Sequence, residues 1–195
     1  RGRTSTEQEN IANFTLEVLS CEIEEVLSPD IKREAITNYA YQILRPFIIP
    51  FSNNELERDI QVYIAVERTF AHGDNPVLRY HLLKLMAPEI TKVNWKTADK
   101  ILPKLGEIYR QIDQDLNHPL KDKIRNAIRK QIPPFLILRD VFEQNPHSVE
   151  AVVTDDIKLK YAVDTACRKR YDESRSRLRR TAVRSFIYIL LTKVI

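Results

Sequence analysis

Four histidines are the residues of this chain best suited to metal binding or acid–base catalysis, but their spacing matches neither use. His72, His81, His118 and His147 form no His-Glu-x-x-His pair and no other metal-ligand pattern. His72 precedes Gly73 at an expected helix end, where a cation commonly interacts with the helix dipole. We therefore interpret all four histidines as structural, and the sequence predicts no metal site and no cofactor.

Other catalytic patterns are also missing. With three glycines in 195 residues, the chain has no Gly-x-Gly-x-x-Gly, Walker or Gly-x-Ser-x-Gly motif. Adjacent acid pairs such as Glu24-Glu25 and Asp155-Asp156 point to helix faces about 100° apart. A carboxylate dyad could still assemble from separate helices, but the Glu-x-x-His pairs of di-iron bundles are missing. The sequence indicates a protein that is not an enzyme.

Two further patterns do not support a site. Asp113, Asp115 and Asn117 imitate the start of a calcium loop, but the sixth and twelfth positions are His118 and Ile124 instead of Gly and Glu. The two cysteines, 21 and 167, form no Cys-x-x-Cys pair. We expect both thiols to be reduced and buried on helices.

Charge is concentrated near the C-terminal end. Residues 161–195 hold nine Lys/Arg against three Asp/Glu, whereas residues 1–160 hold 22 against 24. The basic side chains between 168 and 184 are the candidate membrane-surface or phosphate-binding residues: Arg168, Lys169, Arg170, Arg175, Arg177, Arg179, Arg180 and Arg184. The pI near 9.0 is therefore a property of one segment and not of the whole chain.

This basic segment has three interpretations. A solvated helix face would carry more acidic residues than Asp172 and Glu173. A nucleic-acid-binding stripe would interleave aromatic residues with the cations, and only Tyr171 does so. A collar beside a membrane explains both the cations and the apolar run that follows, at about 1 kcal/mol per basic residue near an anionic leaflet.

The apolar run that follows is the second candidate contact surface, for a membrane or for a partner helix. Its candidate contact residues are Phe186, Ile187, Ile189, Leu190 and Val194. Residues 186–195 are too few for a span of about 20 residues, and Lys193 interrupts them. A buried terminal helix and the start of a span that continues beyond Ile195 both remain open. Self-association through residues 186–195 is a further alternative.

Composition and periodicity predict an all-α fold. The low glycine content and ten prolines indicate helices joined by short, proline-punctuated connections. We expect an irregular bundle of about eight helices in one domain. Residues 1–154 form the body, and residues 155–195 form one long C-terminal helix that is capped by Asp155 and packs on the body at its start.

Apolar spacing at three and four residues predicts the buried faces. For the first helix, which ends near Leu27, the predicted buried stripe is Ala12, Leu16, Leu19, Ile23 and Val26. For the second, which Ser28 should cap, it is Ile31, Ala35, Tyr39 and Ile43. Gly73 is expected to end a helix in the left-handed conformation, and residues 135–138 should form a central buried helix.

Five stretches of the chain together resemble an uncharacterised family of helical bacterial proteins, found mainly in candidate-phylum bacteria. They are DIQVYIAV (59–66), LRYHLLKL (78–85), NHPL (117–120), PPFLILRD (133–140) and AVRSFIYI (182–189). Chains of that family continue into hydrophobic, membrane-embedded segments, and no activity is known for them. The resemblance implies a helical domain attached to a membrane, and it supplies no catalytic residues.

The sequence therefore predicts a non-enzymatic, cytoplasmic interaction or scaffold module at the inner face of a membrane. Its partner would be an anionic membrane surface or a protein. A nucleic-acid-binding protein that uses the basic helix, and a homo-oligomeric scaffold, are the alternatives.

Overall fold

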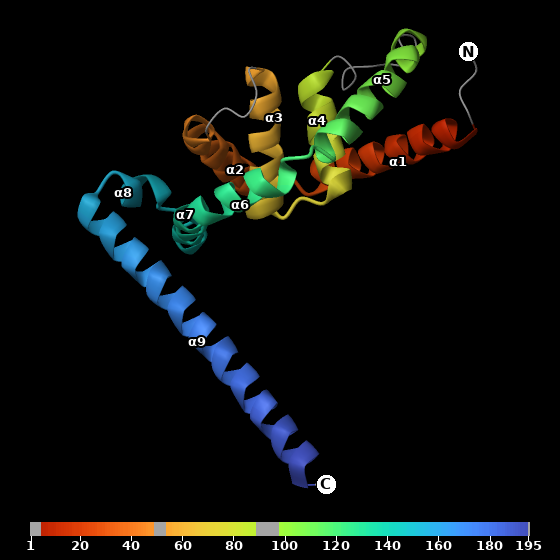
Figure 1. The fold of residues 1–195 in the computed structure, drawn as a ribbon. Helices are drawn as coiled ribbons and strands as arrows, with labels where there is room; N and C mark the ends of the chain where they lie inside the picture. The colour runs from red at the N-terminus through yellow and green to blue at the C-terminus, as the bar shows by residue number, and fades with distance from the viewer. Residues whose placement is uncertain (1–4, 49–53, 89–97, 195) are drawn as a thin grey trace. The chain divides into compact units, whose positions relative to one another are not determined.

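The computed structural model describes residues 5–48, 54–88 and 98–194, and it confirms the predicted all-α class. These residues form nine α-helices and no strand (Figure 1). The chain divides into two compact units, Arg1–Pro133 and Pro134–Ile195. Each unit has its own cluster of buried hydrophobic side chains.

Within its described residues, the first unit contains six α-helices and two short segments of other helix types. The α-helices are α1 (Ser5–Leu27), α2 (Ile31–Leu44), α3 (Glu55–Val66), α4 (Asn75–Met86), α5 (Ala98–Leu116) and α6 (Lys121–Gln131). A 3₁₀ turn, η1 (Arg45–Phe47), extends α2, and a π-helix, η2 (Glu67–Ala71), extends α3. Helix α4 packs against α1 and α5, while α3 packs against α2 and α6.

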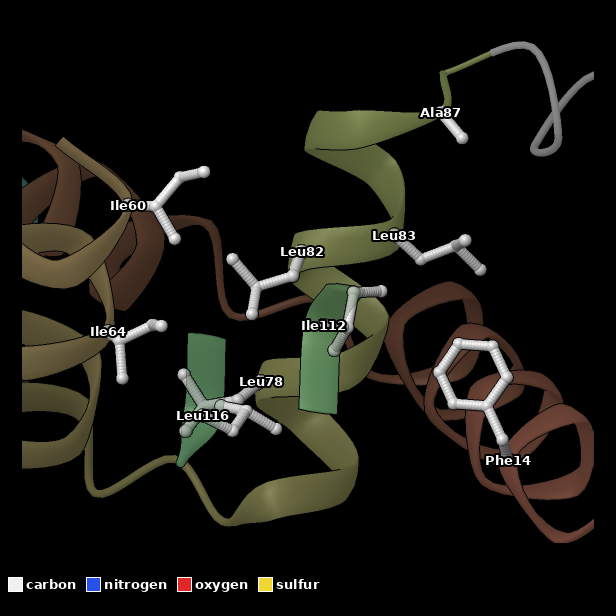
Figure 2. Packing of buried hydrophobic residues seen from close by; sticks show 9 residues of the cluster. All are labelled: Phe14, Ile60, Ile64, Leu78, Leu82, Leu83, Ala87, Ile112 and Leu116. Carbon is white, nitrogen blue, oxygen red and sulfur yellow. The ribbon is translucent and has the colours of Figure 1, made fainter. Parts of the chain in front are cut away.

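The core of this unit lies around α4. Figure 2 shows Leu78 and Leu82 of α4 beside Ile60 and Ile64 of α3, with Ile112 of α5 close by. Phe14 of α1 belongs to the same cluster and packs against Tyr109, with 5.3 Å between the ring centroids. Burial of these side chains, at about 1.5–3 kcal/mol each, joins four helices.

The buried face of α1 is not the predicted one. The stripe from Leu16 to Val26 faces solvent, and Ile23 is 58% exposed, whereas Phe14 is 1% exposed. Helix α1 has a second, narrower apolar stripe through Phe14 and Val18. Glutamates beside that stripe form ion pairs with α4: Glu17 with Arg79 at 2.7 Å, and Glu25 with Lys84 at 2.7 Å.

The predictions for α2 were also wrong. Ile31, Tyr39 and Ile43 are exposed, and the buried residues are Ile36, Thr37, Ala40 and Leu44. The cap is Asp30 instead of Ser28, because the Asp30 carboxylate accepts a hydrogen bond from the Arg33 amide at 3.0 Å. A carboxylate at this position also interacts favourably with the helix dipole.

The left-handed residue after η2 is His72 (φ 57°) and not Gly73. The π-helix explains the shift, because its wider turn brings both the His72 and the Gly73 amides to the carbonyl of Glu67. The π-helix therefore ends the helical segment that begins as α3.

The second unit contains α7 (Pro133–Gln144), α8 (Val149–Val153) and α9 (Asp156–Val194). Val141, Val152 and Ala166, one from each helix, form its small core. Residues 135–138, predicted to lie in a central buried helix, belong to α7 of this unit, where Leu136, Ile137 and Leu138 are half-buried. The predicted cap of the long helix is confirmed: Asp155 accepts hydrogen bonds from the amides of Ile157 and Lys158 at 3.0 and 3.1 Å.

Candidate functional site

Helix α9 consists of a packed first part and an exposed second part. Leu159, Ala162 and Val163 pack against α7 and α8. Arg170 follows, and its guanidinium donates to both oxygens of Asp140 and to the carbonyl of Leu136 in α7. Every residue from Tyr171 to Lys193 is exposed. The structure thus separates Arg170, which is held by α7, from the other candidate basic residues.

The remaining seven basic candidates are all exposed, and none forms an ion pair with another described residue. At 100° per residue, Arg168, Lys169, Arg175, Arg177, Arg179, Arg180 and Arg184 spread over roughly 200° of the helix circumference. The opposite side carries Tyr171 and Leu178, which are uncharged. The cations therefore surround more than half of the helix and do not form a narrow stripe.

The apolar run lies exposed at the far end of the same continuous helix. The side chains from Phe186 to Leu191 are 48–69% exposed, and Phe186, Ile187, Ile189 and Leu190 of the candidate set are among them. The hydroxyl of Thr192 donates to the carbonyls of Tyr188 and Ile189, which satisfies it within the helix. Val194 ends α9, and its side chain and Ile195 lie outside the described residues.

Across the described ranges, no helix combines the length and the apolar character that crossing a membrane requires.

A second group of chemically capable side chains lies in the first unit, where the sequence suggested none. The Tyr63 hydroxyl lies 3.2 Å from Oε1 of Glu67 and 3.2 Å from Nδ1 of His81. Nδ1 of His81 is itself 3.3 Å from the same glutamate oxygen. Burial and the Glu67 carboxylate raise the pKa of Tyr63 far above its ordinary value, so its phenol stays protonated and remains a donor.

Glu67 and His81 of this cluster line two cavities of the first unit, and Tyr63 lines the larger of the two. The larger has a volume of about 330 Å³, and its lining includes Glu34, Tyr41, Tyr63, Glu67, His81 and Lys84. The smaller has a volume of about 150 Å³ and is lined by Cys21, Glu24, Asp30 and Arg33, among others. Glu34, Glu67 and His81 line both cavities.

The chemistry of the cavities does not favour nucleophilic catalysis. Cys21 and His81 line the same cavity, as a thiol and its base would. However, burial and then the carboxylates of Asp74 and Glu24 raise the pKa of the Cys21 thiol, whereas a nucleophilic cysteine needs a lowered pKa. Among the residues described, no three His, Cys, Asp or Glu side chains lie together as a metal ion would require.

The other motifs from the sequence have structural partners. Asp113 and Asp115 lie in α5, where Asp113 pairs with Arg79 at 3.4 Å. His118 accepts a hydrogen bond from the Leu120 amide at Nδ1, which leaves Nε2 to donate to Glu57 at 3.1 Å. The cluster of His81 with Tyr63 and Glu67 was not predicted from the sequence. The one sequence signal for it was the four-residue spacing of Tyr63 and Glu67, which places them on one helix face.

Comparisons of the chain with protein-family models, with curated proteins and with solved structures find no match. The resemblance to a family of helical bacterial proteins therefore stays a prediction.

Proposed function

We propose that this protein is a non-enzymatic interaction or scaffold module that attaches to an anionic membrane surface through the exposed part of α9, at the cytoplasmic face. One observation carries the proposal: an exposed apolar run directly follows a set of exposed, unpaired cations on one continuous helix. Water-exposed apolar runs of this kind mark contact sites, and flanking cations favour an anionic lipid surface over a neutral partner.

The dimensions of the helix fit entry by its apolar end. Residues 186–194 rise about 12 Å along the axis, at 1.5 Å per residue, close to the ~15 Å depth of one hydrocarbon leaflet. Arg179, Arg180 and Arg184 lie within about 10 Å of Phe186 on the same scale. Their long side chains reach the headgroup layer. Because headgroups would surround the helix on all sides, cations spread around its circumference can all contact them.

The polar groups of the apolar end are compatible with this placement. The Thr192 hydroxyl already has carbonyl acceptors within α9, so it loses little on leaving water. Lys193 is exposed, and placing its charge deep in the bilayer costs about 3 kcal/mol, which the apolar side chains must outweigh. Each basic residue near the surface contributes about 1 kcal/mol, and each fully buried Ile or Leu contributes about 1.5–3 kcal/mol.

Vesicle co-sedimentation tests the proposal. The full chain is mixed with neutral phosphatidylcholine vesicles or with vesicles containing anionic phosphatidylserine, and we expect binding to the anionic vesicles that weakens with salt. A variant with Arg179, Arg180 and Arg184 changed to Gln should lose at least tenfold in affinity. A matched variant with Lys123, Arg129 and Lys130 of α6 changed to Gln, three exposed cations elsewhere, should bind as the wild type does.

Two alternatives are outcomes of parallel measurements. Strong, salt-dependent binding to oligonucleotides without vesicle binding would favour nucleic acid as the partner of the same arginines. Concentration-dependent sedimentation that Ile187→Ser and Leu190→Ser abolish would instead favour self-association through the apolar end.

A further inference from the structure

Two of the cavities in the first unit adjoin each other at the buried Glu67 carboxylate. Glu67 is 5% exposed and lines both cavities. Its Oε1 atom takes the contacts from Tyr63 and His81. Oε2 has no hydrogen-bond partner among the described residues, and it lies 3.4 Å from where a Cβ on Gly73 would stand. One oxygen of a buried carboxylate thus remains available for a further donor.

The charges that line the cavities do not balance. Five acidic residues contribute to the walls: Glu24, Glu25, Asp30, Glu34 and Glu67. Glu25 is paired with Lys84 and Asp30 with Arg33. Glu24 and Glu34 then remain without a basic partner, and Glu67 faces His81 at 3.3 Å. The walls therefore attract a cation.

The shape and the remaining lining favour an organic cation. The rings of Tyr41 and Tyr63 meet edge to face, with centroids 5.7 Å apart, and both line the larger cavity. Aromatic faces attract ammonium and guanidinium groups, and about 330 Å³ is at the lower end of the range for small-molecule sites. Glu67 is the first residue of the π-helix.

We propose that these cavities bind a small organic cation, a primary ammonium or a guanidinium, with Glu67 as the main anchor and Glu34 as a second carboxylate at the mouth. The Tyr63 hydroxyl and His81 hold the Glu67 side chain in place, and Tyr41 and Tyr63 contact the apolar part of the ligand. This site lies wholly in the first unit, so the proposal does not depend on the role of α9.

Methylguanidinium and its neutral isostere N-methylurea are the probes. Each is titrated into the full chain, and amide chemical shifts are followed by NMR. Methylguanidinium should give saturable shifts around Glu67 with a Kd on the order of 1 mM, as expected for a fragment of this size. N-methylurea should give no saturable shifts.

Variants identify the anchor. Glu67→Gln, which keeps the side-chain shape, should weaken methylguanidinium binding at least tenfold, and Glu34→Gln should weaken it severalfold. Glu22→Gln, at a glutamate of α1 that lines neither cavity, is the control and should bind as the wild type does. Because Glu34 is exposed, its variant keeps the test valid even if Glu67→Gln unfolds.

Three results would each overturn the proposal. The first is the absence of saturable shifts with methylguanidinium up to 50-fold above the expected Kd. The second is equal binding of N-methylurea. The third is an affinity for methylguanidinium that is unchanged in Glu34→Gln and in every folded Glu67 variant.

Discussion

Arg170 of α9 donates from Nε and Nη2 to the two oxygens of Asp140 in α7. This ion pair marks the end of the packed part of α9, because every residue from Tyr171 to Lys193 is exposed. The same side chain that the sequence grouped with the basic candidates therefore helps to hold α9 on α7.

Breaking this pair should loosen the second unit. Arg170→Gln leaves Asp140, whose side chain is 17% exposed, without its cation, and a two-point charged contact at a partly exposed site contributes about 1–2 kcal/mol. Amide hydrogen exchange at Leu159, Ala162 and Val163 should accelerate by about tenfold. Arg175→Gln, in the exposed part of α9, should leave these rates unchanged. Equal acceleration in both variants would contradict a specific role for the pair.

The two faces of α1 should differ sharply in their effect on stability. Phe14→Ala removes a core ring and should lower the free energy of unfolding by about 3–5 kcal/mol. Ile23→Ala changes an exposed side chain and should alter it by less than about 0.5 kcal/mol. Urea titration measures both values. A large loss for Ile23→Ala would mean that the face predicted from periodicity is the buried one.

The Glu25–Lys84 pair should make stability depend on acid pH. Burial alone would raise the pKa of Glu25, but hydrogen bonds from Lys84 and Tyr80 outweigh it and the pKa lies below its ordinary value of 4.5. A lowered pKa means that the folded state binds the proton less readily than the unfolded state. The contribution of Glu25 is therefore present above pH 4.5 and is lost as the pH falls through the folded-state value.

Urea midpoints of the wild type and of Glu25→Gln check this pH dependence. The difference between them should be constant from pH 7 to pH 5 and should shrink below pH 4.5. Glu24→Gln, at an exposed glutamate, is the matched control. A difference that grows on acidification would reverse the assigned sign.

Substitutions at the two residues after η2, His72 and Gly73, should affect stability differently. His72 is left-handed, with φ 57°, which costs a non-glycine residue about 1 kcal/mol. His72→Gly should therefore stabilise the protein by about 0.5 kcal/mol, after the added freedom of the unfolded chain is subtracted. Gly73 has no positive φ, and a Cβ there would meet ordinary contacts at 3.4 Å or more, so Gly73→Ala should not destabilise. Thermal unfolding of both variants would show the opposite order if Gly73 were the left-handed residue.

The fold class follows from local properties that the sequence contains. The low glycine content indicates helices in general. The apolar spacing and caps such as Asp155 involve residues close together in the chain, so they also predict where helices such as α9 begin. The buried face of α1 depends on a distant helix. Helix α1 carries two apolar stripes, and Arg79 and Lys84 of α4 pair with glutamates beside the narrower one. The apolar periodicity within α1 therefore cannot predict which of the two stripes is buried.

The candidate cavities were beyond sequence analysis for a similar reason. Tyr63 and Glu67 are four residues apart on one helical segment, but His81 comes from α4, and its approach to Glu67 is a tertiary contact. The π-helix also changes the register after Val66, which shifted the left-handed residue from Gly73 to His72. By contrast, the basic segment and the apolar run were already candidate contact residues in the sequence, and the structure adds that they are exposed.

The depth of Ile189 in a membrane tests the central proposal most directly. A nitroxide is attached at Ile189→Cys, or at Leu178→Cys as the control, after Cys21 and Cys167 are changed to Ala. Its accessibility to a water-soluble nickel reagent is then measured with anionic vesicles. We predict that accessibility falls severalfold at position 189 and stays nearly unchanged at position 178. A label at position 189 that remains as accessible as it is without vesicles would contradict insertion of the apolar end of α9.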